Sequence, residues 1–223
     1  TAPSVTLSAS PVSIDENAAV SVLTATLSVA TSQDVTVNIG YTGTASGSGT
    51  DYTASATITI LAGQLTGTTT ITSVEDLIYE GDETVVADIT SVSGGGASED
   101  GSQQQTITIT DNETAPSVTL SASPVSIDEN AAVSTLTATL SVAASQDVTV
   151  NIAYTGTASG SDYNASASIT ILAGQLTGTT TITSVEDLIY EGDETVVADI
   201  ASVSGGGASE DGSQQQAVTI TDN

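Results

Sequence analysis

The side chains that could do chemistry in this chain are almost all carboxylates. The sequence holds 27 Asp and Glu but no Lys, Arg, His or Cys, so it offers no imidazole, thiol or ammonium group. Carboxylates without a basic partner have to be neutralised by hydrogen bonds, by solvent or by a bound cation. We therefore expect metal ions as the counter-charge. Nucleic acid and direct membrane contact are excluded as partners, because nothing in the chain neutralises phosphate.

The carboxylates are gathered in short segments between strand-like stretches. In the first half of the chain these segments are chiefly Asp15-Glu16, Asp34, Asp51, Glu75 to Glu83, Glu99-Asp100 and Asp111 to Glu113. Two unit charges about 4 Å apart repel by about 4 kcal/mol at an effective dielectric of 20, so converging acids need something to offset them. Calcium suits this role best, because it takes roughly six to eight oxygen ligands and needs neither nitrogen nor sulfur. Magnesium normally takes fewer carboxylates, and zinc prefers His or Cys.

The chain contains one module twice. Residues 1–112 align with residues 114–223, with eight substitutions and one two-residue deletion at Gly49-Thr50. This period is far longer than the roughly 20–50 residues of a solenoid repeat, so we expect each copy to be a whole domain. The expected domains are 1–113 and 114–223. With almost no linker between them, neighbouring repeats should contact one another and form a monomeric rod.

Apolar and polar residues alternate with a period of two, which is typical of half-buried strands. About seven short strands in a copy of this length favour a β-sandwich, and no segment has a helical period, so the fold is predicted to be all-β. Pro11 is expected to kink the first strand region before Ser13, because proline lacks an N–H. In the first copy the predicted strands are 4–8, 20–28, 35–41, 56–60, 68–71, 84–92 and 105–110.

Four acidic motifs occur in the same order in each copy. In the first copy they are Ser-Ile-Asp-Glu-Asn at 13–17, Gly-Thr-Asp-Tyr at 49–52, the run 75–83, and Thr-Ile-Thr-Asp-Asn at 108–112. Together they resemble the Calx-beta domain, which is found as the calcium sensor of sodium–calcium exchangers and as repeats in large bacterial surface proteins. The resemblance implies two tandem seven-stranded immunoglobulin-like sandwiches, each with calcium ions at one tip.

The resemblance also implies a set of calcium ligands. In the first copy they are Glu16, Asp51, Glu75, Asp76, Glu80, Asp111 and Glu113, and in the second Glu129, Asp162, Glu186, Asp187, Glu191 and Asp222. The sequence reads Glu-Asp-Leu at 75–77 and Asp-Asn-Glu at 111–113, where the exchanger sensors have three consecutive Asp. We therefore expect fewer or weaker ions than in those sensors. Asp82 and Glu83 fit a solvated strand edge as well as an ion site, Asp88 is expected on an outer sheet face, and Glu99-Asp100 is expected to be solvated.

Several functional classes are compatible with a folded acidic β-module. Catalysis is not expected, because the usual bases, thiols and oxyanion-binding groups are absent and the chain has no Trp to line a sugar cleft. The Thr-rich stretches 67–72 and 106–110 could present hydroxyls to ice or sugar, but Thr is a common outward strand residue, and Thr106 becomes Ala217 in the second copy. The favoured hypothesis is a calcium-stiffened extender of a secreted bacterial adhesin of the repeats-in-toxin type, located at the cell surface. The alternative is a calcium-sensing regulatory pair of the exchanger type.

Overall fold

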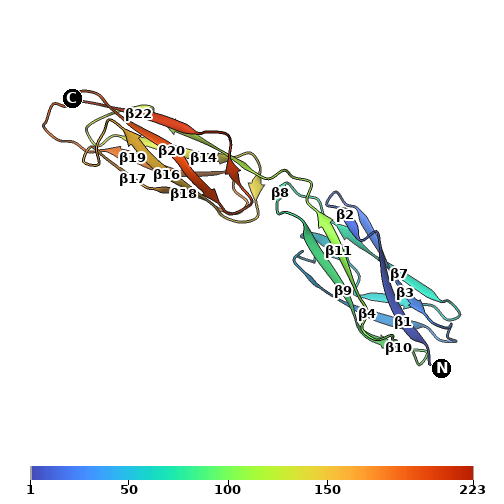
Figure 1. The fold of residues 1–223 in the computed structure, drawn as a ribbon. Coiled ribbons are helices and arrows are strands. Elements are labelled where there is room, and N and C mark those ends of the chain that lie inside the picture. The colour runs from blue at the N-terminus through green and yellow to red at the C-terminus, as the bar shows by residue number, and fades with distance from the viewer. Residues whose placement is uncertain (1, 223) are drawn as a thin grey trace. The chain divides into compact units, whose positions relative to one another are not determined.

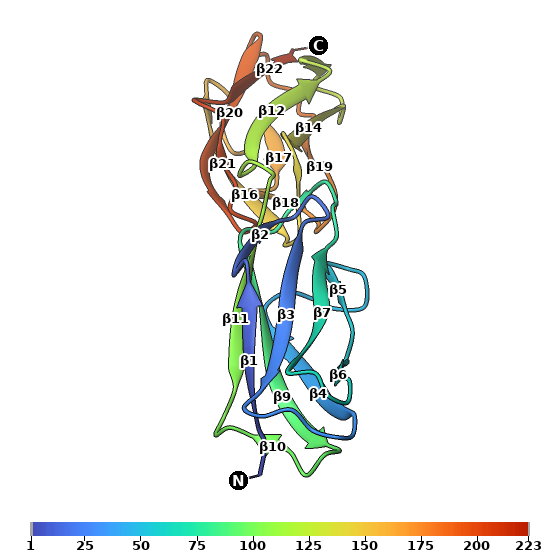
Figure 2. The same cartoon turned by 90° about the vertical axis from the view of Figure 1, so that its right-hand side faces the viewer.

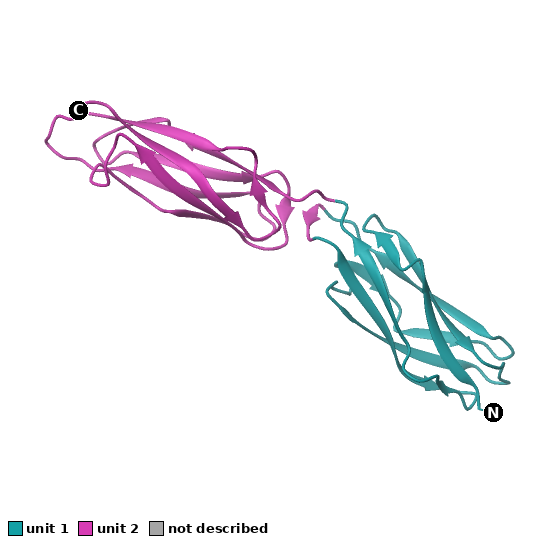
Figure 3. Ribbon diagram, viewed as in Figure 1, with its two compact units in different colours: residues 1–76, 81–112 teal, residues 77–80, 113–223 magenta. Residues whose placement is uncertain are grey.

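The computed structural model describes residues 2–222, and all its regular elements are β-strands (Figure 1). The chain divides into two compact units, drawn in different colours in Figure 3. The first holds the residues up to Asp76 and those from Gly81 to Asn112, and the second holds residues 77–80 and those from Glu113 onward. Within residues 2–222 no helix is long and apolar enough to cross a membrane.

The first unit is a sandwich of two five-stranded sheets. One sheet has the order β10-β1-β3-β7-β5 and the other the order β2-β11-β9-β4-β6; Figure 2 shows β1, β3 and β7 side by side. The strands of the first sheet are β1 (Ser4–Ser10), β3 (Val20–Leu27), β5 (Tyr52–Ala54), β7 (Thr66–Ser73) and β10 (Ser98–Glu99). Those of the second are β2 (Ser13–Asp15), β4 (Val35–Gly43), β6 (Thr57–Ile60), β9 (Glu83–Ser93) and β11 (Gln104–Thr110).

All seven strands predicted for the first copy are present, and the first unit has three short additional strands, β2, β5 and β10. The interruption predicted at Pro11 is confirmed. β1 ends at Ser10 in one sheet and β2 begins at Ser13 in the other, so the proline lies where the chain crosses between sheets. The buried hydroxyl of Ser21 donates a hydrogen bond of 2.7 Å to the Pro11 carbonyl and fixes this crossover.

The second unit repeats this architecture. Its sheets have the orders β17-β19-β14-β12-β21 and β13-β22-β20-β16-β18, and a third, two-stranded sheet pairs β15 with β8 (Ile78–Tyr79). The remaining strands are β12 (Ser117–Ser123), β13 (Ser126–Asp128), β14 (Val133–Leu140), β15 (Ala143–Ala144), β16 (Val148–Gly156), β17 (Tyr163–Ala165), β18 (Ser168–Ile171), β19 (Thr177–Ser184), β20 (Glu194–Ser204), β21 (Ser209–Glu210) and β22 (Gln215–Thr221).

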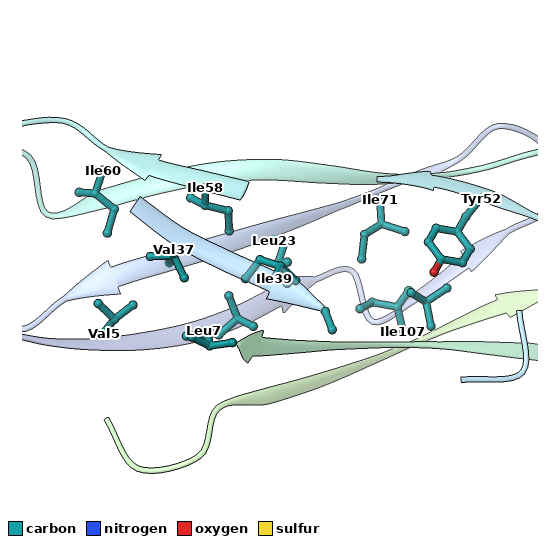
Figure 4. Packing of buried hydrophobic residues seen from close by; sticks show 14 of the residues in the cluster. Val5, Leu7, Leu23, Val37, Ile39, Tyr52, Ile58, Ile60, Ile71 and Ile107 are labelled. Carbon is teal, nitrogen blue, oxygen red and sulfur yellow. The ribbon is translucent and has the colours of Figure 1, made fainter. Parts of the chain in front are cut away.

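Each sandwich encloses an aliphatic core made by the inward residues of its two sheets. In the first unit Leu23 and Ile71 from one sheet face Val37, Ile58 and Ile107 from the other, all of them fully buried (Figure 4). The alternation of buried and exposed residues along each strand follows the period of two read from the sequence. Outward residues such as Asp88 remain at the surface, as predicted.

Two substitutions between the copies are physically coupled. A Cβ built on Gly40 would lie 2.8 Å from Cγ2 of Thr90, closer than ordinary van der Waals contact. The second copy carries alanine at the position of Gly40, namely Ala153, and there the threonine is replaced by Ala201. The larger residue therefore occurs only where its neighbour has become smaller, as expected for a closely packed surface between strands.

Candidate metal centre

Strand pairing places the acidic loops of the second unit at one end of its sandwich. Asp128 ends β13 opposite Thr221 at the end of β22, and Tyr163 begins β17 opposite Ser184 at the end of β19. Glu194 begins β20 in the same end region, where it pairs with Ile220. The segments that follow or precede these strand ends carry the predicted ligands, so the topology itself brings them together.

Glu129 is held inward by the loop that follows β13. Its N–H donates to the Thr221 carbonyl at 3.0 Å, and the buried hydroxyl of Ser184 donates to the Asp128 carbonyl at 2.7 Å. Ala131, whose N–H donates to the Glu129 carbonyl, has a φ of 64°, a left-handed conformation that costs a non-glycine residue about 1–2 kcal/mol. The Glu129 side chain is 6% exposed. The loop thus buries a carboxylate by means of a strained backbone and two tethers.

Five carboxylates of the second unit form two linked groups. In each group, one oxygen from each of three residues lies within 4.8 Å of the others. Glu191 belongs to both groups. The first group contains Glu129, Asp187 and Glu191, and the second contains Asp162, Glu191 and Glu194.

Backbone hydrogen bonds position the loop that carries Glu191. One carboxylate oxygen of Asp222 accepts from the N–H groups of Glu191 and Gly192, at 2.7 and 2.6 Å. Asp162 follows the turn after β16; it is 8% exposed and accepts from the Ser159 N–H and the Ser161 hydroxyl. The acids are therefore fixed by the fold rather than spread in solvent.

Crowding raises the pKa of three of these acids. Burial raises the pKa of Glu129, and the negative charges of Asp187, Asp222, Glu186 and Glu191 raise it further. Burial and neighbouring carboxylates likewise raise the pKa of Glu191. For Glu194, burial comes first, followed by its hydrogen bond to Asp162 and nearby negative charge. A cation in their midst would relieve this repulsion.

Asp162 behaves in the opposite way. Burial by itself raises the pKa of this carboxyl, but hydrogen bonds from Ser159, Ser161 and Glu194 outweigh it, and the pKa lies below its ordinary value. Asp162 therefore keeps its charge most readily in the group. A fixed anion beside acids of raised pKa is a suitable anchor for a hard cation.

The first unit repeats part of this arrangement among its own residues, as pairs of neighbouring carboxylates. Carboxylate oxygens of Glu16 lie within 4.8 Å of Asp76 and of Asp111, and Asp51 lies equally close to Glu83. Glu16 is 4% exposed and Asp51 5%. The tether is repeated as well, since the Ser73 hydroxyl donates to the Asp15 carbonyl at 2.7 Å. Both copies thus build an acidic centre at the same strand ends.

Three predicted ligands lie outside these groups, namely two glutamates at the start of the acidic loop and Asp222. In the first copy Glu75 accepts a hydrogen bond of 2.9 Å from the Asn112 amide, and Glu75 and its counterpart Glu186 appear in no carboxylate group of residues 2–222. Asp222 acts on the backbone of the loop, as does Asp111, which accepts from the Gly81 N–H at 2.6 Å. Glu80 and Glu113 belong to the segments that cluster with the second unit. The assignment of the whole set as calcium ligands stays a prediction.

Two acids of the centre are absent from the predicted set of ligands, although for Glu83 the sequence left an ion site and a solvated strand edge equally open. Glu83 and Glu194 each begin a long strand and approach Asp51 and Asp162, respectively. A signal was present, because Glu83 continues the inward series of Val85, Ala87 and Ile89 by the period of two. The inward register of a strand thus extends one residue into the acidic loop.

The donors of both centres fit a hard cation. Among the described residues the groups offer only carboxylate oxygens, and the chain has no imidazole or thiolate to attract zinc. Several carboxylates carried on loops match the oxygen-rich coordination of calcium better than the small, hydrated shell of magnesium. The residues that would hold an ion in the second unit are Glu129, Asp162, Asp187, Glu191 and Glu194.

A β-sandwich with an acidic centre built from its loops defines the class of module, here present twice. The chain belongs to the Calx-beta domain family, because the model of that family matches residues 1–113 and again residues 111–223. A search of curated proteins finds no match.

Solved structures similar to the chain include Calx domains. The crystal structure of CBD12 from CALX1.2 is 16% identical over 96% of this chain and 99% of that chain, with a TM-score of 0.43. The calcium binding domain CBD12 of CALX1.1 is 13% identical, with coverages of 96% and 99% and a TM-score of 0.42. The apo-form Calx CBD1 domain is 20% identical over 48% of this chain and 97% of that chain, with a TM-score of 0.41.

Proposed function

We propose that the chain is a calcium-binding extender segment of a secreted, repetitive adhesin on a bacterial cell surface. The observation that carries the calcium proposal is the convergence of Glu129, Asp162, Asp187, Glu191 and Glu194, without any basic side chain in the sequence. The tandem of two nearly identical copies supports the extender role, since a spacer needs repeated length rather than divided tasks. The segment itself does not indicate which ligand such an adhesin would bind.

Calcium would stabilise each module by neutralising the acids that the fold holds together. Binding to the folded state alone contributes RT ln(1 + [Ca]/Kd), about 2.7 kcal/mol at a hundredfold excess over Kd. Extracellular calcium is roughly millimolar, and extracellular modules commonly bind it with a Kd of about 0.1–1 mM. Sites of this affinity would remain empty before export and would bind calcium afterwards.

The short connection between the copies gives calcium a second proposed role. Asp111-Asn112-Glu113 ends the first copy and Thr114 begins the next, so the sequence leaves almost no linker. Ions bound by the acids of this stretch would restrict the joint as well as the module. We infer that calcium stiffens a rod of such modules, and that its removal lets the joint flex.

The test is thermal unfolding of the full chain in excess EDTA and in a calcium series, with small-angle scattering on the same samples. Magnesium at equal concentration is the control for general screening of charge. We expect a calcium-specific rise in Tm and a longer, narrower scattering envelope. Indifference of both Tm and shape to millimolar calcium would overturn the proposal, whereas a rise in Tm without a change in shape would reject only the stiffened joint.

The second candidate is a calcium-sensing regulatory pair. It is favoured by the family itself, one of whose uses is calcium sensing in exchangers. Titration calorimetry separates the two roles: a sensor pair divides its work and should show two classes of site, whereas an extender with matching acids in both copies should show one. Glu16, Asp51, Asp76 and Glu83 have identical counterparts in the second copy, which supports a single class.

A further inference from the structure

A short strand from the first copy is seated on the edge of the second unit. β8 runs parallel to β15, with Ile78 opposite Ala143 and Tyr79 opposite Ala144. The Ser145 N–H donates to the Tyr79 carbonyl at 3.0 Å. Figure 3 colours residues 77–80 with the second unit, to which they belong. This is β-augmentation, in which an added strand satisfies the unpaired backbone of a sheet edge.

The Tyr79 ring packs against Gly207, next to this edge. A Cβ added to Gly207 would lie 2.5 Å from Cε1 of Tyr79, and the φ of Gly207 is +64°. Glycine is therefore required there both by its backbone conformation and by the ring that covers it. With β8 in place, Ala143 is half-buried, whereas its counterpart Ala30 in the first unit is exposed.

The second copy contains the same segment, but within residues 2–222 it forms no strand and pairs with no sheet edge. Residues 188–190 repeat the Leu-Ile-Tyr sequence of residues 77–79. Leu188, Ile189 and Tyr190 are 99%, 63% and 87% exposed, whereas Ile78 and Tyr79 are half-buried. Three adjacent large apolar residues at such exposure form a patch of the kind that marks an interaction site.

The first unit contains the same edge without a strand on it. Its counterpart of β15 is Ala30-Thr31, where Ala30 is exposed and the neighbouring Val29 is 48% exposed. Within residues 2–222 the Ser32 N–H has no recorded acceptor, although its counterpart Ser145 donates to Tyr79. A Cβ on Gly96, the counterpart of Gly207, would meet nothing within 4 Å. Segment 188–190 and the Ala30-Thr31 edge thus correspond to the paired strands β8 and β15, but within residues 2–222 neither of them is paired as a strand.

We propose that residues 188–190 dock as a parallel strand on the Ala30-Thr31 edge of another copy of this chain, with the Tyr190 ring over Gly96. The contact is heterologous, so its repetition gives an open head-to-tail series rather than a closed dimer. It is backbone-directed, which explains why the edge tolerates threonine at position 31 where the occupied edge has Ala144. A two-residue pairing is weak between separate molecules and strong only when a tether raises the effective concentration.

Disulfide trapping tests the contact, because the natural chain has no cysteine and only introduced thiols can react. The observed register places Ile189 opposite Ala30, and paired strands lie about 4.8 Å apart, within the range of Cα distances that a disulfide spans. The I189C/A30C double variant is oxidised at a moderately high salt concentration, which screens repulsion between chains of charge −27. Non-reducing electrophoresis then separates dimers, trimers and longer products.

Two control variants make the result decisive. The L172C/A30C variant carries a thiol of similar exposure, since Leu172 is 60% exposed and Ile189 63%, but at a site outside the proposed strand. The I78C/A143C variant has its thiols at the pair already seen in register and should close within one chain. Thermal unfolding of each reduced variant verifies that it folds.

We expect I189C/A30C to form a ladder of multimers at least about tenfold faster than L172C/A30C, and Y190G to abolish the difference. Equal rates for the two variants would overturn the proposal. Failure of I78C/A143C to close would overturn the pairing on which it rests. The comparison is run in EDTA and in calcium. A ladder that forms in EDTA supports the docking contact even if the chain does not bind calcium, so the two proposals can fail separately.

Discussion

Replacing Glu194 by glutamine should change stability in opposite directions with and without calcium. Glu194 lies in one acidic group with Asp162 and Glu191, and burial and these neighbours raise its pKa. The amide keeps the shape of the side chain but removes one charge. Without calcium, E194Q relieves repulsion in the folded state, so the Tm of the second unit should rise. With calcium, it removes a charged ligand oxygen, and the affinity should fall.

The size of the calcium effect follows from linkage. Loss of supporting groups around a metal typically lowers affinity about 10–100-fold, and a direct ligand should cost at least the lower figure. At a calcium concentration a hundred times the natural Kd, the stabilisation is about 2.7 kcal/mol, and a tenfold weaker site leaves about 1.4 kcal/mol. A loss of about 1.3 kcal/mol corresponds to a calcium-induced rise in Tm that is smaller by about 5–10 °C.

Differential scanning calorimetry of the full chain in EDTA and in calcium measures both effects. The matched control is D193N, which removes the same charge from the adjacent residue, an exposed residue that is not a member of either acidic group. If E194Q and D193N give equal shifts in both buffers, Glu194 does not face an ion. The geometric assignment of the second group would then be wrong.

Three further predictions follow from particular contacts. G40A should destabilise the first unit by about 1 kcal/mol, because the added Cβ meets Thr90. The G40A/T90A double variant should recover the natural stability, which a double-mutant cycle by chemical denaturation would measure. S184A should cost about 1–3 kcal/mol and weaken calcium binding in calorimetry, because it leaves the Asp128 carbonyl without its buried donor; an unchanged affinity would show that this tether does not position Glu129. In EDTA, lowering the pH from neutral toward the ordinary pKa of glutamate should raise the Tm of the second unit, and saturating calcium should remove this gain. The folded form, in which the pKa values of Glu129, Glu191 and Glu194 are raised, binds protons more tightly than the unfolded form, so the stabilisation is present at low pH and lost as pH rises through the folded pKa values.

The long strands of the sandwich were predictable because their burial is periodic. Val35, Val37 and Ile39 alternate with polar residues, and each such stretch is a strand in the structure. The short strands β5 and β10 were not predicted, since two or three residues are too few to show a period. They form because a neighbouring edge offers unpaired backbone groups, which is a property of the sheet and not of the segment.

The acidic centre was predictable in its location and only partly in its members. Motifs place Glu129 and Asp162 at strand ends, and the topology then brings these ends together. Glu186 and Asp187 are consecutive and of similar chemistry, yet only Asp187 is a member of a carboxylate group. Adjacent side chains in an extended segment point in opposite directions, so the choice between them depends on loop conformation that no spacing rule supplies.

The architecture of the centre explains why calcium rather than the core should decide the stability of the second unit. Its core is aliphatic and continuous, and a comparable core is present in the first unit. At the acidic end, by contrast, the fold buries Glu129 and Asp162, holds Ala131 in a left-handed conformation and seats Ser184 beneath the loop. The burial of Glu129 and the conformation of Ala131 are unfavourable while the acids only repel one another. They become mutually consistent when a cation occupies the carboxylate groups, and because Glu191 is shared, ions in the two groups would bind cooperatively through its position.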